Sequence, residues 1–316
     1  MNEWDLIRSL ARRAGTGGAG ILTGIGDDGA VTAVPAGFEL VTVLDTLVAG
    51  THFPADLEPR AIGHRALAVN LSDLAAMGAE PRWCLLGLSL QQPSASWLEA
   101  FADGLCDLAE GFGLRLIGGD TVRGPLVITV TALGLVPAGR AILRSGAMPG
   151  DQIYVTGWPG EAGFAWRAAL GGESLKNADP LQQRFAYPSP RVNEGIALRG
   201  IASAMIDLSD GLIDDLGHLL DSSVCGAELD ADAVPLSSAL LERAGAELAL
   251  ELALNGGDDY ELCFTVPAGR ESALTRAIAG FGCPVRRIGT VVEGSSMAWR
   301  RHGQLWDPPR TGFAHF

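Results

Sequence analysis

The sequence predicts an α+β protein with two domains. Its 316 residues exceed what one hydrophobic core usually organises, and 47% of them are apolar, which is sufficient for two cores. Apolar runs typical of strands alternate with segments of helical spacing in both halves of the chain. A turn-rich segment, residues 144–151, separates the halves, so we place one domain at residues 1–140 and the other at residues 141–316.

The N-terminal half is expected to combine three helices with four strands. Gly78 is typical of a helix end, and Ser94 is typical of a residue that starts one. Helices are expected at residues 3–14, 59–77 and 95–112, and strands at residues 40–44, 83–90, 114–117 and 126–136. The first strand runs into Asp45, and Asp120 is expected in the turn between the last two strands.

The C-terminal half shows a similar alternation, with a polar connection expected through residues 180–190. Helices are expected at residues 160–170, 191–202, 211–221, 237–254 and 269–280, and strands at residues 152–156, 204–207, 260–266, 284–289 and 296–300. Because strands and helices are mixed in both halves, the pattern indicates the α+β class.

The charge and cysteine content exclude several classes of protein. Acidic residues outnumber basic ones by 37 to 23, and the net charge of −14 opposes binding to nucleic acid or to an anionic membrane. The five cysteines form no C-x-x-C pair, which argues against a disulfide framework and a zinc site. Asp5, Arg8, Arg12 and Arg13 interrupt any apolar signal core, and no apolar run reaches the roughly 18 residues of a membrane span. We therefore expect a cytoplasmic protein.

Six short segments carry aspartates, several of them beside glycine. Carboxylates that converge repel one another unless divalent cations lie between them, and Mg²⁺ prefers such oxygen ligands. The pattern predicts magnesium and a phosphate-bearing ligand, and hence a metal-dependent nucleotide enzyme. The segments are Gly24–Asp28, Asp45–Leu47, Ser72–Asp73, Gly118–Asp120, Asp207–Gly211 and Gly256–Asp259.

Several of these motifs also have a plainer interpretation. Residues 24–29 match the dinucleotide pattern G-x-G-x-x-G, but no strand is expected before them and two carboxylates occupy the turn. We therefore favour metal binding there over a structural turn or a dinucleotide site. An aspartate of the 207–212 segment could cap the helix that follows. Residues 118–121 could form an ordinary turn, or their glycines could let a phosphate approach the main chain.

Other motifs of nucleotide-binding and hydrolytic enzymes are missing from the sequence. No glycine-rich loop ends in Gly-Lys-Ser or Gly-Lys-Thr, so phosphates must be held without a P-loop. His52 and His64 have no third imidazole or cysteine at zinc spacing, and there is no nucleophile elbow. Arg144 could be a surface residue or could contact a phosphate.

Taken in order, the motifs resemble the thiamine-monophosphate kinase family, which belongs to the superfamily that includes aminoimidazole ribonucleotide synthetase. The resemblance runs from Gly24 to the tail at residues 312–316, and residues 70–79 and 206–212 are its longest ordered matches. It implies an N-terminal domain that binds ATP and metal and pairs with its twin to close a β-barrel across a homodimer. It also implies a C-terminal α+β domain that covers the nucleotide cleft and completes the active site.

The resemblance further implies the ligands and the residues that hold them. ATP is the expected phosphoryl donor, thiamine monophosphate the acceptor, and several magnesium ions the cofactor. Asp45, Asp120 and Asp210 are the expected catalytic residues. The expected magnesium ligands are Asp28, Asp45, Asp73, Asp120, Asp207 and Asp210, with Asp27 adjacent. The expected ATP contacts are Gly119, Asp120, Arg144 and Ser209, and the expected substrate contacts are His52, Asp258 and Phe313.

Three places depart from the family pattern. Val43 and Leu44 stand where the family usually has hydroxyl residues, so side-chain metal ligation there is lost or is supplied by main-chain carbonyls or water. Asp258 stands at a position that is usually glutamate and is one methylene shorter. Phe313 replaces tyrosine or tryptophan, which keeps stacking but removes a polar tip.

The expected reaction needs no strong base. Its acceptor is a phosphate monoester whose oxygen is already anionic near neutral pH, so the lack of a catalytic histidine is expected. Magnesium ions held by aspartates would neutralise both phosphates and align them for direct in-line transfer. Two alternatives remain open: another ATP-dependent activity of the superfamily, and a nucleotide- and metal-binding sensor that has lost catalysis.

Overall fold

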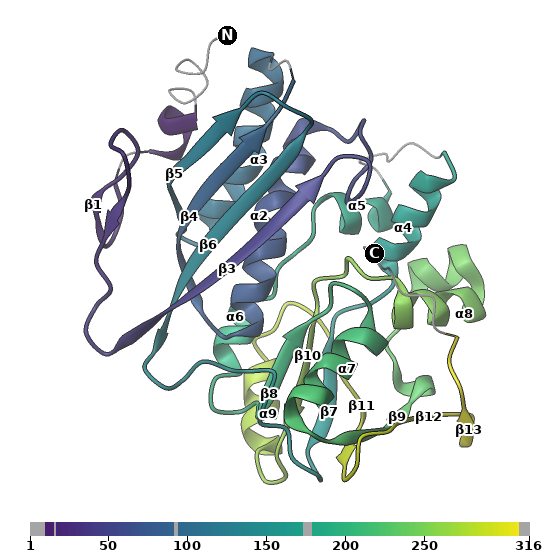
Figure 1. Cartoon of the computed structure of the whole chain (residues 1–316). Coiled ribbons are helices and arrows are strands. Elements are labelled where there is room, and N and C mark those ends of the chain that lie inside the picture. The colour runs from purple at the N-terminus through teal and green to yellow at the C-terminus, as the bar shows by residue number, and fades with distance from the viewer. Residues whose placement is uncertain (1–9, 16, 92–93, 173–178, 310–316) are drawn as a thin grey trace. The chain divides into compact units, whose positions relative to one another are not determined.

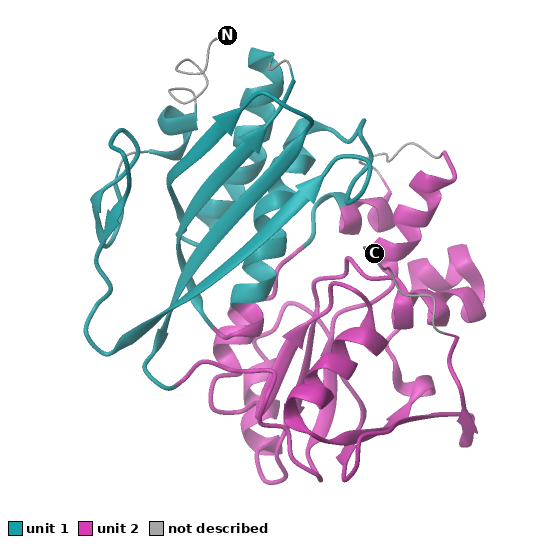
Figure 2. Cartoon of the chain, in the orientation of Figure 1, with its two compact units in different colours: residues 1–74, 79–139, 186–188 teal, residues 75–78, 140–185, 189–316 magenta. Residues whose placement is uncertain are grey.

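The computed structural model of the chain describes residues 10–15, 17–91, 94–172 and 179–309. It contains two compact units (Figure 2). Unit 1 comprises residues 1–74, 79–139 and 186–188, and unit 2 comprises residues 75–78, 140–185 and 189–316. Each unit contains both strands and helices, so the predicted α+β class is confirmed.

Unit 1 is built on a four-stranded sheet with the order β3-β6-β4-β5 (Figure 1). Its strand pairs are antiparallel except for β4 and β5, which are parallel. Helices α2 and α3 lie on one face of the sheet, called here the covered face, and the opposite face is the open face (Figure 1). The elements are β1 (Ile21–Thr23), β2 (Val31–Thr32), β3 (Phe38–Val48), α2 (Pro59–Ala76), β4 (Glu80–Ser89), α3 (Ala95–Gly111), β5 (Arg115–Val122) and β6 (Val127–Pro137).

Strand β3 shows the difference between the two faces. Val41 and Leu47 are buried, whereas Leu40 and Leu44 are exposed, because successive side chains of a strand point to opposite sides. Asp45 has the same parity as Val41 and Leu47 and therefore lies on the covered face.

Helices α2 and α3 approach each other through two glycines. A Cβ atom at Gly63 would lie 2.0 Å from the carbonyl oxygen of Phe101, and one at Gly104 would lie 1.9 Å from the carbonyl oxygen of Arg60. Both positions therefore require glycine for the two backbones to touch. Helix α2 is buried along most of its length.

Unit 2 is built on a seven-stranded sheet with the order β13-β12-β9-β11-β7-β10-β8. Its pairs are antiparallel except for β12 and β9. Apolar residues of α7 and α8, such as Leu216 and Leu254, share one core with strand residues such as Ile153 and Ile206. The elements are β7 (Gln152–Thr156), α4 (Glu161–Leu170), α5 (Pro180–Ala186), α6 (Val192–Ala197), β8 (Ala204–Asp207), α7 (Leu212–Ser223), β9 (Gly226–Asp230), η1 (Ala231–Ala233), α8 (Ser238–Asn255), β10 (Leu262–Val266), α9 (Glu271–Ile278), β11 (Val285–Val292), β12 (Met297–Arg301) and β13 (Gln304–Trp306).

Several predicted elements differ in extent from those observed. Strand β3 continues through Asp45 to Val48, because residues 46–48 still pair with β6. Asp120 lies within β5 rather than in a turn, because β5 pairs with β4 as far as Val122. The predicted connection at residues 180–190 contains α5, and β1, β2, β9 and β13 are additional strands. Of the helix predicted at residues 3–14, the structure describes residues 10–14, which are helical.

The glycine motif at residues 24–29 is preceded by β1, contrary to the prediction, but the next element is β2 and not a helix. The strand-to-helix unit of a dinucleotide site is therefore not formed there. In the described part of the chain, none of the helices has both the length and the apolar character of a membrane span.

Candidate functional site

Two of the predicted metal ligands meet in unit 1. Asp45 lies on the covered face of β3, Asp73 lies in the last turn of α2, and a hydrogen bond joins their side chains. Burial raises the pKa of Asp45, and the bond with Asp73 opposes this shift. Two carboxylates in contact must share a proton or a cation, because both cannot be ionised there without one. The pair therefore fits a hard cation such as Mg²⁺, which prefers carboxylate oxygens.

The two departures before Asp45 have different consequences. Val43 has the same parity as Asp45 along β3, so its side chain is on the covered face beside the carboxylate. Leu44 points to the open face and is 60% exposed. A hydroxyl at position 44 would point away from Asp45, so only the change at Val43 removes a side-chain oxygen from this carboxylate's surroundings.

Asp120 and Gly119 lie on β5, three strands from Asp45. Asp45 is in register with Val130 on β6, Val130 with Leu86 on β4, and Leu86 with Gly119. Neighbouring strands are about 4.8 Å apart, which places Gly119 roughly 14 Å from Asp45. Asp120, the next residue, is exposed and lies on the open face. Unit 1 therefore does not bring Asp120 to the Asp45–Asp73 pair.

Gly119 is glycine for a structural reason. A Cβ atom at this position would lie 2.0 Å from the carbonyl oxygen of Leu86 on the neighbouring strand. The ordinary-turn interpretation of residues 118–121 is wrong, because these residues belong to β5. The glycine is needed for strand pairing, whether or not it also lets a phosphate approach the main chain.

The two predicted acids of the glycine motif in unit 1, Asp27 and Asp28, are exposed. Asp27 and Asp28 lie between β1 and β2, and Asp27 Oδ1 accepts a hydrogen bond from the Asp28 N–H at 2.9 Å. Among the described residues, no three His, Cys, Asp or Glu side chains are close enough to hold a metal ion. The complete set of six metal ligands therefore stays a prediction.

Two histidines of unit 1 are held by backbone groups. His52 follows β3, and its Nδ1 accepts a hydrogen bond from the Val48 N–H at 3.0 Å, which orients the ring. His64 on α2 is 2.9 Å from the carbonyl oxygen of Pro188 through Nε2, and its ring meets Tyr187 edge to face. His64 therefore fastens residues 186–188 to α2, which is a structural role.

In unit 2, residues 207–211 form the junction between β8 and α7. Asp207 ends β8 and is only 4% exposed, whereas Ser209 is exposed and Asp210 is half-buried. Asp215 Oδ2, in the first turn of α7, accepts hydrogen bonds from the N–H groups of residues 209, 210 and 211 at 2.9, 3.0 and 3.1 Å. Because the N-cap residue is Gly211, neither Asp207 nor Asp210 caps the helix, and that interpretation is wrong.

Asp215 belongs to the candidate site, and the sequence analysis did not predict it. Burial and the charges of Asp207 and Asp210 raise the pKa of Asp215, the N–H groups of Asp210 and Gly211 lower it, and the net result is a pKa of about 8. The three carboxylates thus carry more negative charge than the nearby N–H groups balance, which favours a cation at this junction. The available signal was the pair Asp214-Asp215, but acids are common in the first turn of any helix.

Arg144 lies on a segment that runs along the edge of the unit 2 sheet. The carbonyl oxygen of Leu143 accepts a hydrogen bond from the Met205 N–H in β8 at 3.0 Å. The carbonyl oxygen of Arg144 accepts one from the Ser223 hydroxyl at 3.0 Å. The exposed Arg144 side chain therefore belongs to a fixed backbone next to the strand that ends at Asp207.

The predicted substrate contact Asp258 lies on a segment that pairs with the 207–211 junction. The Asp258 N–H donates to the Ser209 carbonyl oxygen, the Tyr260 N–H to that of Leu208, and the Leu208 N–H to that of Glu261, each at 2.8 Å. Residues predicted to hold metal, ATP and substrate thus meet within unit 2. The other predicted substrate contact, Phe313, lies outside the described residues.

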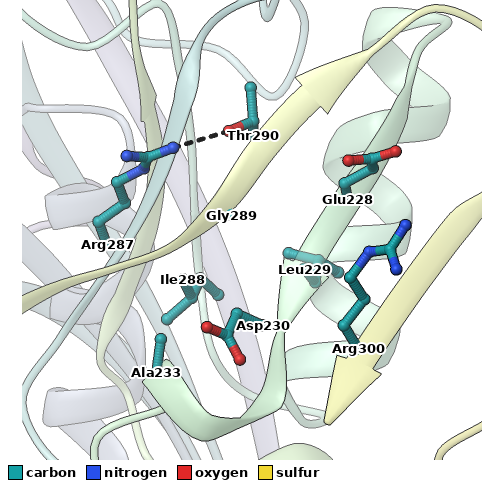
Figure 3. A pocket seen from close by; sticks show the side chains of 9 residues that line it. All are labelled: Glu228, Leu229, Asp230, Ala233, Arg287, Ile288, Gly289, Thr290 and Arg300. Carbon is teal, nitrogen blue, oxygen red and sulfur yellow. Dashed lines mark hydrogen bonds between the residues drawn. The ribbon is translucent and has the colours of Figure 1, made fainter. Parts of the chain in front are cut away.

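A separate open pocket of about 370 Å³ lies in unit 2 (Figure 3). Its polar lining includes Arg287, whose Nη2 donates to Thr290 Oγ1 at 3.0 Å, and also Glu228, Asp230 and Arg300. None of the predicted site residues that the structure describes lines this pocket. The pocket is therefore distinct from the carboxylate sites.

Comparison with known proteins gives matches along the whole chain. Residues 26–136 match the N-terminal domain of the AIR synthase related proteins, and residues 148–300 match their C-terminal domain. Thiamine-monophosphate kinase of Escherichia coli (strain K12) is 47% identical over 320 residues, which covers 99% of this chain and 98% of that protein.

Solved structures agree with the sequence matches. The crystal structure of thiamine-monophosphate kinase from Stenotrophomonas maltophilia K279a is 44% identical, with a TM-score of 0.85 and coverage of 96% of both chains. AaThiL complexed with AMPPCP and TMP is 28% identical, with a TM-score of 0.78 and coverage of 99% of this chain and 97% of that one. On these matches, the chain belongs to the thiamine-monophosphate kinase family of AIR synthase related proteins.

Proposed function

We propose that this chain transfers the γ-phosphoryl group of ATP to thiamine monophosphate and releases thiamine diphosphate and ADP. The observation that carries the proposal is the identity of 47% with a thiamine-monophosphate kinase over nearly all of both chains. The likeness to AaThiL, which was solved with AMPPCP and TMP, supports the same two ligands.

We propose Mg²⁺ as the cofactor because the carboxylates of both units fit it. Asp45 and Asp73 in unit 1, and Asp207 and Asp210 in unit 2, would hold the ions, with Asp28 and Asp120 as the further predicted ligands. Hard carboxylate oxygens are the donors that Mg²⁺ prefers. When bound, Mg²⁺ neutralises phosphate charge, so that two anions can approach.

The protein's own groups then bind and orient the two substrates. Ser209 and Arg144 would contact ATP with a hydroxyl and a cation, and Gly119 would contact it with its main chain. His52, Asp258 and Phe313 would face thiamine monophosphate. Asp45, Asp120 and Asp210 are the proposed catalytic residues.

The chemistry is a direct displacement at phosphorus. A phosphate oxygen of thiamine monophosphate forms the new bond to the γ-phosphorus, the bond from that phosphorus to the β,γ-bridging oxygen breaks, and ADP leaves with the electron pair. The attacking oxygen is already anionic near neutral pH, so no residue has to remove a proton from it. The proposal includes no phosphoenzyme.

We also propose that the chain works as a homodimer joined through the open face of the unit 1 sheet. Leu40, Leu44, Leu85 and Val122 are all exposed on this sheet. A group of large exposed apolar side chains is typical of an interface. A second copy packed there would close the β-barrel implied by the family resemblance, and Asp120 would then face the partner. We also propose that the C-terminal domain covers the nucleotide cleft.

The deciding experiment is incubation of the purified chain with ATP, Mg²⁺ and thiamine monophosphate, followed by chromatography for thiamine diphosphate and ADP. Matched reactions omit Mg²⁺ or replace thiamine monophosphate with thiamine. The expected result is equal amounts of both products, formed only in the complete reaction.

The alternatives give different results in the same assay. A sensor that has lost catalysis would bind ATP and Mg²⁺ but release no ADP when thiamine monophosphate is added. Another ATP-dependent enzyme of the superfamily would leave thiamine monophosphate unchanged. Either result would refute the proposed kinase activity.

A further inference from the structure

We propose that Tyr260 is a positioning residue for substrate recognition and that it acts by fixing the direction of the Asp258 carboxylate. The Tyr260 hydroxyl donates a hydrogen bond to Asp258 Oδ1 at 2.9 Å, and Tyr260 is only 7% exposed. The inference rests on the proposed function, in which Asp258 contacts thiamine monophosphate.

The backbone around Asp258 has an uncommon conformation. Gly257, Asp258 and Tyr260 have φ values of 64°, 60° and 52°, all in the left-handed region. This region is uncommon for residues other than glycine, and such residues persist where the surrounding structure holds them and concentrate at functional sites. Here the three 2.8 Å backbone hydrogen bonds to and from residues 208 and 209 hold the segment against the junction after β8.

Buried carboxylates anchor the segment on both sides of Tyr260. Asp259 is 3% exposed, and its Oδ2 accepts a hydrogen bond from the Gly160 N–H at the start of α4 at 2.8 Å. Burial raises the pKa of Asp259 well above its ordinary value, and the bond from Gly160 opposes the shift. Asp259 and Glu261, the two neighbours of Tyr260, are thus both buried, whereas Asp258 is half-buried.

Glu261 is fully buried and is the stronger anchor. Its carboxylate accepts hydrogen bonds from Arg184 at 2.7 Å, from Arg191 at 2.6 and 2.5 Å, and from the Thr156 hydroxyl at 2.7 Å. With the main chain held in this way, the orientation of the Asp258 carboxylate depends mainly on its own side-chain rotation. A hydrogen bond to one of its oxygens then also fixes the direction of the other oxygen.

The chemistry of the substrate indicates which part Asp258 recognises. Thiamine monophosphate carries a cationic thiazolium ring and an anionic phosphate. A carboxylate attracts the ring and repels the phosphate, so a fixed Asp258 favours the orientation in which the phosphate points away from it. Tyr260 would therefore improve substrate binding without taking part in phosphoryl transfer.

The test is the Tyr260→Phe variant, which removes only the hydroxyl. We expect the KM for thiamine monophosphate to rise about tenfold, the size expected for one hydrogen bond to a charged group. We expect kcat to stay within about twofold, because the reacting atoms are untouched, and the KM for ATP to stay unchanged, while the Tm falls by no more than about 4 °C through loss of one internal hydrogen bond. Tyr154→Phe is the matched control, since Tyr154 is a strand residue of the same unit that stacks on Phe264.

A double-mutant cycle shows whether Tyr260 acts through Asp258. In an Asp258→Ala background the hydroxyl has no carboxylate to hold, so Tyr260→Phe should have no further effect on the KM for thiamine monophosphate. Calorimetric titration of each variant with thiamine monophosphate in the absence of ATP measures the same effect on the Kd without turnover.

The outcomes separate this inference from the proposed function. An unchanged KM and Kd in Tyr260→Phe, or the same tenfold rise in the Asp258→Ala background, would overturn the role of Tyr260 and leave the kinase proposal intact. A parallel loss of kcat, ATP affinity and Tm would show a merely structural role and would also overturn it. Failure of the unaltered chain to bind thiamine monophosphate would overturn both.

Discussion

The two units hold their acidic residues in different ways. In unit 1, Asp45 and Asp73 meet because a regular strand and a regular helix pack together. In unit 2, Asp210 and Asp258 lie on irregular segments that Asp215 and Glu261 fasten with hydrogen bonds. The first arrangement therefore depends on packing and the second on a few buried polar side chains, and substitutions should distinguish them.

The largest effect is expected from removing one carboxylate in either unit. Asp45→Asn and Asp210→Asn should each lower kcat by about 10²- to 10⁴-fold with little change in Tm, because a proposed metal ligand loses its charge while the shape is kept. Steady-state assays at saturating Mg²⁺ measure this. Asp56→Asn and Asp221→Asn, exposed acids of the respective units, are the controls. Near wild-type turnover in either active-site variant would refute that metal assignment.

The next largest effect should be confined to unit 2. Glu261→Gln leaves Arg184 and Arg191 without their buried carboxylate, which should lower the free energy of unfolding by about 3–5 kcal/mol. Urea unfolding at neutral pH measures the change. The control is Glu247→Gln, which alters an exposed ion pair with Arg301 and should leave the midpoint where it was. Equal midpoints for both variants would show that Glu261 is no anchor.

The same residue should make stability depend on pH. Burial raises the pKa of Glu261, but the hydrogen bond and charge of Arg191 and the charge of Arg184 outweigh burial and hold it below the ordinary value of 4.5. The unfolded chain then takes up the proton first, so the stabilisation is complete above that value and is lost as the pH falls through the folded pKa. The stability difference between wild type and Glu261→Gln should therefore be constant above about pH 5.5 and should shrink as the pH falls below 4.5 towards the folded pKa. A difference that stays constant as the pH falls in this way would contradict the assignment.

A smaller effect is expected for assembly through unit 1. Leu44→Glu places a charge on the open face of the sheet and should raise the dimer dissociation constant by at least about tenfold. Analytical ultracentrifugation measures this. Leu170→Glu changes a leucine of similar exposure on α4 and should have no effect. A wild-type chain that is monomeric at micromolar concentration would disprove the proposed interface.

The smallest effect tests the strand geometry beside Asp45. Val43→Thr restores a hydroxyl on the covered face and should lower the Mg²⁺ concentration for half-maximal rate by about twofold to fivefold, because it adds an oxygen ligand. Leu44→Thr should leave this concentration unchanged, since its side chain points to the open face. The reverse result would mean that β3 has a different register in solution.

The regular helices and strands could be predicted from the sequence. The strand register and the conformation of the irregular segments could not. The helices near residues 59–77 and 95–112 are confirmed, and Ser94 caps α3 by accepting the Trp97 N–H as expected. The register of β5 was not predictable, because its pairing with β4 contains an irregularity that no sequence pattern in β5 indicates. With this register, Asp120 lies on the open face of the sheet. The left-handed residues Asp258 and Tyr260 also carry no local signal, since their conformation depends on partners elsewhere in the chain.

The same reasoning applies to the candidate site. The aspartates themselves are evident from their motifs, whereas Asp215 and Glu261 are recognisable only from the groups they fasten. An aspartate in the first turn of a helix, such as Asp215, can have several roles, so its sequence position alone does not reveal this one. Glu261 is recognised as a buried ion-pair partner only through arginines that lie about 70 residues away in the sequence. Long-range pairing of this kind is set by the fold and has no counterpart in local spacing.

The glycine crossing of α2 and α3 has a consequence for screens of inactive variants. A methyl group at Gly63 or Gly104 would wedge the two helices apart, and Asp73 is carried by α2, so the displacement would reach its partner Asp45. Such alleles would lose turnover without any change in a ligand-binding residue, and their defect should worsen on warming. A survey that measures activity alone would mistake Gly63 and Gly104 for catalytic residues.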